Sequence, residues 1–172
     1  MIVGLQQSHD QLGARASACN DTPNTATVTP TTPQLPDALN PYLAFRDSAR
    51  EAMEFYRSVL GGELTVSTFG DMHDWDDPSE NAKVMHSMLT TDRGFVLMAS
   101  DTPQGTGYTP GTNFSLSLSG DDESVLRGWW DALTADGRVD MPLERAPWGD
   151  LFGMCTDRFG VSWMVSIGDQ QG

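Results

Sequence analysis

Two residues on neighbouring predicted strands carry side chains suited to acid–base chemistry. His86 lies in the strand predicted over residues 83–89, and Asp101 follows the strand predicted over 95–99. An imidazole beside a carboxylate can act as a general base or orient a ligand. The favoured alternative is a strand histidine satisfied by an ordinary neighbour, because no nucleophile accompanies it. A one-residue change in strand register would also move His86 to the other face of the sheet.

A second histidine stands in an acidic segment. His73 lies among several aspartates within residues 70–81, a composition that resembles a metal cluster. The spacing has neither the glycine turn nor the terminal glutamate of a calcium loop. We therefore interpret the segment as a solvated acidic loop.

Composition excludes some classes of partner. The chain has 172 residues and a net charge of −14, from 24 acidic and 10 basic residues. Phosphate backbones bind clustered lysine and arginine, so we expect no nucleic-acid partner. No apolar run of about 18 residues is present, so we expect no membrane partner. Cys19 and Cys155 are too few for a disulfide framework, which predicts free thiols in the cytoplasm.

The elements that position these side chains begin at residue 39. Residues 1–38 are rich in Thr, Pro, Asn and Ser without periodicity, which predicts a disordered tail, and 169–172 form a second tail. After an apolar strand, Ser48 and Glu51 have the spacing of a helix capping box. The helix has an apolar face at helical spacing and ends at a pair of glycines.

The same plan then occurs a second time. One strand, one helix and three strands are predicted over residues 39–101, and again over residues 112–168. Each unit alone would leave one sheet face open, so the units must cover each other or a partner chain. This pattern predicts an α+β domain over residues 39–168 built from two βαβββ modules.

Several motifs in this order resemble a known family. They are residues 46–62 (RDSAREAMEFYRSVLGG), 84–89 (VMHSML), 97–101 (LMASD), 148–153 (WGDLFG) and 157–165 (DRFGVSWMV). This set is similar to the PhnB-like branch of the vicinal oxygen chelate superfamily, which includes glyoxalase, bleomycin-resistance, fosfomycin-resistance and dioxygenase proteins. The resemblance implies that the two modules form a curved mixed sheet around a cleft, and that the protein is a homodimer.

The metal ligands of the superfamily are His and Glu on facing strands. Carried over by the helix and turn anchors, their positions fall on Pro41, Met98, Asn113 and Met164. Proline has no ligand atom, and a thioether does not suit Mg²⁺, Mn²⁺ or Zn²⁺. We therefore expect no metal site and no cofactor.

The cleft implied by the resemblance is lined by apolar and weakly polar side chains. Such a surface suits a small, mostly uncharged organic ligand, although a closed core is an equal alternative. The predicted cleft residues are Leu43, Phe45, Met98, Asn113, Ser115, Trp148 and Met164.

Three functions follow from these observations. The first is a metal-free protein that binds a small organic molecule, and the second is a metal-dependent lyase or transferase with displaced ligands, using His86 and Asp101. The third is a structural or regulatory dimer with no active site. Some members of this branch are named methyltransferases, but the chain lacks a glycine fingerprint for S-adenosylmethionine. If it is an enzyme, we expect a glyoxalase or dioxygenase-superfamily activity instead.

Overall fold

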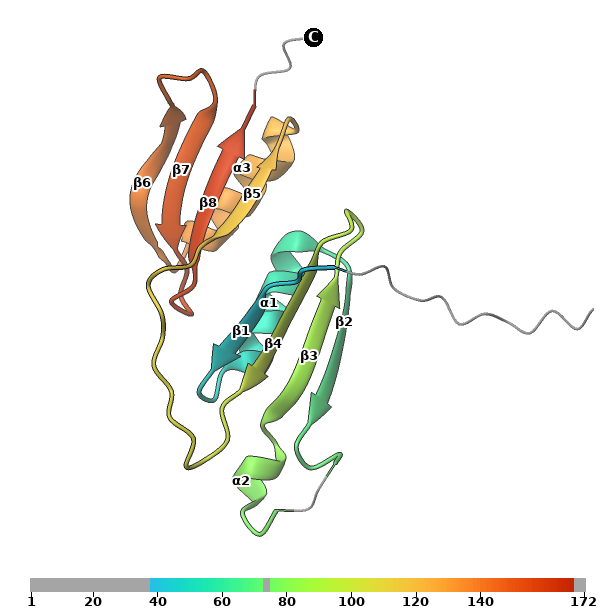
Figure 1. The fold of residues 1–172 in the computed structure, drawn as a ribbon. Coiled ribbons are helices and arrows are strands. Elements are labelled where there is room, and N and C mark those ends of the chain that lie inside the picture. Colours follow the sequence, from blue (N-terminus) through green and yellow to red (C-terminus); the bar gives the residue numbers. More distant parts are fainter. Residues whose placement is uncertain (1–37, 73–74, 169–172) are drawn as a thin grey trace, which may run out of the picture. The chain divides into compact units, whose positions relative to one another are not determined.

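The computed structural model describes residues 38–72 and 75–168 (Figure 1). The predicted tails, apart from Ala38, lie outside the described residues, as does His73. The elements of the described part are β1 (Tyr42–Phe45), α1 (Ala49–Leu60), β2 (Glu63–Thr68), α2 (Pro78–Asn81), β3 (Val84–Thr90), β4 (Val96–Asp101), β5 (Leu116–Gly120), α3 (Glu123–Thr134), β6 (Arg138–Arg145), β7 (Leu151–Thr156) and β8 (Ser162–Ile167).

The strands form two four-stranded sheets of identical topology. The first has the order β1-β4-β3-β2 and the second β5-β8-β7-β6. β1 runs parallel to β4 in the first sheet, and β5 runs parallel to β8 in the second. All other neighbouring strands are antiparallel. One helix covers one face of each sheet, α1 on the first and α3 on the second (Figure 1). The predicted α+β fold of two βαβββ modules is confirmed, and we name residues 42–101 module 1 and residues 116–167 module 2.

The first helix forms as its pattern predicts but begins differently. Its buried side chains recur at helical spacing, which places one apolar face on the sheet. The predicted capping box is wrong, because Ser48 makes no side-chain cap hydrogen bond. The Ala49 amide instead donates to Asp101 Oδ1 at 2.9 Å. A carboxylate at the end of β4 therefore replaces the local cap.

The acidic loop contains a one-turn helix that the sequence did not predict. Asp77 caps α2 by accepting from the Ser79 amide at 2.9 Å. Glu80 is buried, with Oε1 2.6 Å from Lys83 Nζ and Oε2 accepting from the Gln104 amide at 2.9 Å. The segment is therefore held against the chain that follows β4.

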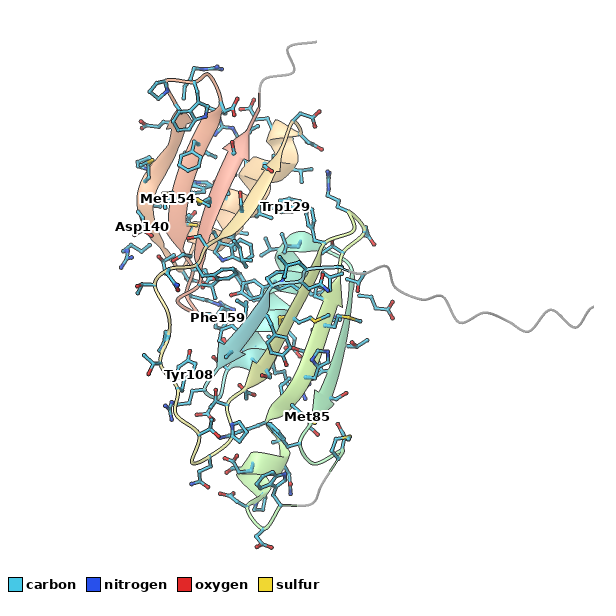
Figure 2. All side chains as sticks on the ribbon, viewed as in Figure 1. Met85, Tyr108, Trp129, Asp140, Met154 and Phe159 are labelled. Atoms are coloured by element: carbon cyan, nitrogen blue, oxygen red, sulfur yellow. The ribbon has the colours of Figure 1, made fainter. Side chains whose placement is uncertain are left out.

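One buried carboxylate joins the two modules. Asp157, in the turn between β7 and β8, is only 4% exposed. Its Oδ2 accepts from the Tyr56 hydroxyl of α1 at 2.7 Å and from Trp163 Nε1 at 2.8 Å. Burial, and then the nearby Asp157 charge, raise the pKa of the Tyr56 phenol. Phe159 in the same turn packs against Phe55 of α1, with ring centroids 5.7 Å apart (Figure 2).

Candidate functional site

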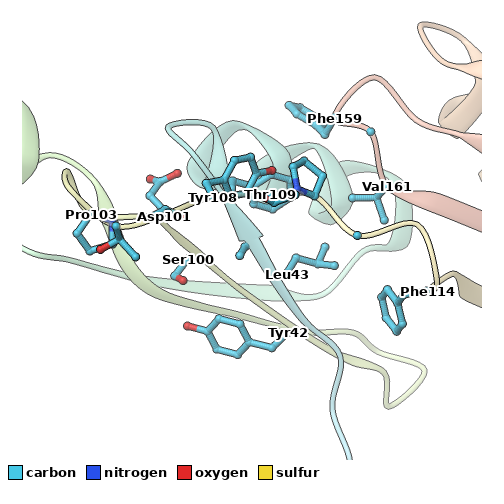
Figure 3. A pocket seen from close by; sticks show the side chains of 18 of the residues that line it. Tyr42, Leu43, Ser100, Asp101, Pro103, Tyr108, Thr109, Phe114, Phe159 and Val161 are labelled. Carbon is cyan, nitrogen blue, oxygen red and sulfur yellow. The ribbon is translucent and has the colours of Figure 1, made fainter.

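A pocket of about 570 Å³ lies beside β1, the edge strand of the first sheet (Figure 3). We name it the β1 pocket. Its walls are β1, the linking segment of residues 102–115, and the turn between β7 and β8. The aromatic side chains in its lining are Tyr42, Phe45, Tyr108, Phe114 and Phe159, and the hydroxyl-bearing ones are Tyr42, Ser100, Thr102, Thr106, Tyr108, Thr109 and Ser162.

Two contacts hold the linking segment in place as one wall. The Gln104 amide donates to the buried Glu80, which also pairs with Lys83. Further along, the guanidinium of Arg46 lies over the Tyr108 ring, 5.3 Å from its centroid. A cation over an aromatic face is attracted by the ring quadrupole. Both contacts tie the segment to the end of module 1 at which α1 begins.

The opposite wall is held by Asp157. Its Oδ1 accepts from the amides of Phe159 and Val161, at 2.8 and 3.0 Å. These bonds fix the turn, so that Phe159 packs edge-on against Phe45 of β1 with ring centroids 6.3 Å apart. Since the same carboxylate also holds Tyr56, Asp157 contributes both to the pocket wall and to the contact between the modules, which Arg93 with Asp122 and Phe95 with Trp129 also make.

Tyr42 connects the pocket with His86. The tyrosine is 50% exposed, and its hydroxyl oxygen lies 3.3 Å from His86 Nδ1 in hydrogen-bonding geometry. The two rings stack with centroids 5.8 Å apart and an angle of 28° between their planes. His86 lies on the sheet face opposite α1, because burial alternates along β3 and the adjacent Ser87 is fully buried. The pair provides a planar surface with a polar edge.

The structure does not bring Asp101 to His86. Asp101 lies on the buried side of β4, where Oδ1 accepts from the Ala49 amide and Oδ2 from the Val84 amide, each at 2.9 Å. Its carboxylate holds the start of α1 and the start of β3. The partner that sequence reasoning missed is Tyr42. Its alternation with the buried Leu43 placed it on the open face, but only the pairing of β1 with β4 brings it near His86.

The positions carried over for metal ligands do not form a donor set. Met98 lies opposite Tyr42 and Met164 opposite Ser117, on separate sheets. Pro41 precedes β1, and Asn113 lies in the linking segment. Within residues 38–72 and 75–168, no group of three or more His, Cys, Asp or Glu side chains is placed to hold a metal ion. The side chains present do not fit a hard divalent cation.

The predicted cleft residues are spread over several places. Leu43 and Phe45 line the β1 pocket from the buried side of β1. Met98 and Met164 occupy the faces of the two sheets opposite the helices. Asn113 and Ser115 belong to the linking segment but not to the pocket lining, and Trp148 is 64% exposed against Phe152 in the turn after β6.

Comparison with known families and proteins agrees with this fold. The family described as the Glyoxalase/Bleomycin resistance protein/Dioxygenase superfamily matches residues 38–165. Protein YjdN of Escherichia coli (strain K12) is 30% identical over 144 residues, which cover 77% of this chain and 97% of that protein.

Solved structures show the same similarity. Protein PA1353 from Pseudomonas aeruginosa shares 38% identity with a TM-score of 0.69, covering 77% of this chain and 100% of its own. A protein from Bacillus cereus, described as a putative 3-demethylubiquinone-9 3-methyltransferase, PhnB protein, shares 27% identity with a TM-score of 0.64 and the same coverages. In the described part of the chain, no helix is both long and apolar enough to cross a membrane.

Proposed function

Because the chain belongs to the Glyoxalase/Bleomycin resistance protein/Dioxygenase superfamily, we propose that it binds a small, mostly uncharged organic molecule in the β1 pocket, without a divalent metal ion. The observation that carries this proposal is the lining of the pocket, which combines aromatic rings with neutral hydroxyls. Its volume of about 570 Å³ falls within the usual range of small-molecule sites.

The charges around the pocket support a neutral ligand. Asp101 is the carboxylate in the lining, and both of its oxygens already accept backbone amides. The Arg46 guanidinium lies over the outer wall at Tyr108. Hydroxyl groups therefore provide most of the side-chain hydrogen bonding open to a ligand. A buried charge on the ligand would have no opposite charge to offset its desolvation.

The Tyr42–His86 pair supplies the polar edge of this site. Tyr42 belongs to the lining, and His86 holds its hydroxyl at 3.3 Å. A ligand carbonyl or hydroxyl that reaches Tyr42 would exchange hydrogen bonds with this pair. Met98, the partner of Tyr42 on the neighbouring strand β4, lies outside the pocket lining.

The other two functions have less support. A metal-dependent lyase or transferase acting through His86 and Asp101 requires the pair to meet, and Asp101 is held on the buried side of the sheet. A purely structural dimer requires no pocket, so the β1 pocket of about 570 Å³ supports the binding proposal over this alternative.

Two further features belong to the same proposal. We expect a homodimer, because β1 and β5 are edge strands of their sheets. We expect the cytoplasm as its location, because the buried Cys155 is a free thiol.

Thermal unfolding in the presence of small neutral aromatic compounds tests the binding proposal. A ligand present at 100 times its Kd stabilises a protein by about 2.7 kcal/mol, which raises Tm measurably. Hits should lose their effect in Tyr108→Ala, which removes one wall. They should keep it in Trp148→Ala, which removes an exposed ring outside the lining.

Two results would contradict the proposal. The first is that no compound in the screen raises the Tm of the protein. The other is a set of hits that stabilise Tyr108→Ala as much as the unchanged protein, or whose effect disappears when EDTA is added.

A further inference from the structure

Three methionines form one row across module 2. Met141 on β6 pairs with Met154 on β7, and Met154 pairs with Met164 on β8. Residues directly opposite each other on neighbouring strands project from the same face, with Cβ atoms about 4.5–5.5 Å apart. The pairing therefore places the three methionines next to one another on adjacent strands, with register shifts on either side of Met141.

The row lies on the face of the second sheet that α3 does not cover. Burial alternates along β7 and β8, where Gly153, Cys155 and Trp163 are buried on the helix side. Met154 and Met164 are partly exposed, and Met141 is 47% exposed. Figure 2 labels Met154 on this sheet together with Asp140 on β6. All three methionines are thus at least partly accessible from this face.

We propose that Met141, Met154 and Met164 form a binding site for a soft monovalent cation of the Cu(I) or Ag(I) type. Thioether sulfur is a soft donor that selects such ions over Mg²⁺, Mn²⁺ and Zn²⁺. Each methionine has three rotatable bonds, so the outer two sulfurs can turn toward an ion above the central one. The site is separate from the β1 pocket, and no bond is made or broken in the protein when the ion binds.

The row adjoins an ion pair, and the acidity of the protein as a whole favours a cation. Asp140 precedes Met141 and accepts from Arg138 Nε at 2.6 Å and from the Thr156 hydroxyl at 2.7 Å. The protein as a whole carries a net charge of −14.

The repeated fold supplies an internal control. In module 1 the corresponding row runs from Tyr42 through Met98 and Met88 to Thr65. It has the same central methionine pair but no third thioether. Module 1 should therefore bind the ion much more weakly, although the two sheets have the same topology.

Silver titration of the full chain tests the site. Ag(I) is added in a chloride-free buffer to protein labelled with ¹³C in its methionine methyl groups, with Cys19→Ser to remove one thiol. Single Met→Leu variants assign the nine methionine signals. We expect the signals of Met141, Met154 and Met164 to shift together and to saturate at one Ag(I) per chain.

Substitution distinguishes this site from general thioether binding. Met154→Leu keeps the side-chain volume and should weaken Ag(I) binding at least tenfold, whereas Met88→Leu should leave it unchanged.

Three outcomes would overturn the proposal. They are no shift of the three signals, an equal shift of Met88 and Met98, and unchanged affinity in Met154→Leu. If Ag(I) binds the Cys155 thiol instead, the three methyl signals do not shift together. That result is the first of these three outcomes.

Discussion

The hydroxyl of Tyr56 in α1 donates a hydrogen bond of 2.7 Å to Asp157, which lies 101 residues later in the turn between β7 and β8. This carboxylate also accepts from Trp163 Nε1 and from two backbone amides of its own turn. One residue therefore joins the modules and shapes a wall of the β1 pocket.

Removing the Asp157 carboxylate should cost more stability than removing the Tyr56 hydroxyl. Tyr56→Phe leaves Asp157 with three donors and should lower the free energy of unfolding by about 1–2 kcal/mol. Asp157→Ala leaves several buried donors unpaired and should lower it by about 3–5 kcal/mol. Urea unfolding measures both values. Equal effects of the two substitutions would show that the carboxylate does not organise the turn.

The start of α1 should depend on Asp101 and not on Ser48. Ser48→Ala should change the free energy of unfolding by less than about 0.5 kcal/mol, since its side chain makes no cap bond. Asp101→Ala removes the acceptor of two buried amides and should cost about 2–4 kcal/mol. Urea unfolding of the two variants checks this, and a cost of 1 kcal/mol or more for Ser48→Ala would restore the local capping box.

The linking segment should loosen in acid. The hydrogen bond to Lys83, followed by that from the Gln104 amide, lowers the pKa of the Glu80 carboxyl. A carboxyl whose pKa is lower in the folded state contributes stability above its unfolded pKa of about 4.3, and the contribution is lost as the pH falls through the folded pKa.

The NMR shift of the Gln104 amide measures this titration. Its midpoint should lie below about 4.3, the ordinary pKa of glutamate. In Glu80→Gln the transition should disappear, because no carboxyl remains at that position. A midpoint at or above the ordinary value would contradict the anchoring role of Glu80.

His86 should affect ligand binding more than stability. His86→Ala removes the ring that stacks on Tyr42, so hits from the thermal screen should bind about 3–10 times more weakly, a change of about 0.7–1.4 kcal/mol. Because His86 is only partly buried, the free energy of unfolding should change by about 0.5 kcal/mol or less. Ser67→Ala, directly opposite on β2, serves as the control and should leave binding unchanged.

Two glycines of module 2 should respond in opposite directions to alanine. A Cβ on Gly153 would lie 2.8 Å from Trp130 Cη2 and 2.9 Å from Leu143 Cα, so Gly153→Ala should destabilise by about 1–3 kcal/mol. Gly128, within α3, has no atom within 4 Å of such a Cβ, and Gly128→Ala should stabilise by up to about 1 kcal/mol. Thermal unfolding of both variants gives the comparison, and a stabilised Gly153→Ala would exclude the close packing of Trp130 on β7.

The two modules follow from local patterns in the sequence. Period-two and helical spacing, together with the glycines after α1 and the turn at Asp157–Gly160, depend on neighbours within a few residues, so the elements could be predicted. The turn between β7 and β8 indeed has Gly160 at φ 83°. The absence of hard ligands at Met98 and Met164 was also visible in the residue types.

The surroundings of His86, Asp101 and Asp157 depend instead on how distant strands pair in the fold. The register of β1 on β4 brings Tyr42 to His86 and sends Asp101 to the start of α1. Parallel strands are joined by long crossovers, so their pairing leaves no local signal in the sequence. The row of Met141, Met154 and Met164 arises in the same way, because irregularities in the pairing of β6 with β7 set which residues stand opposite.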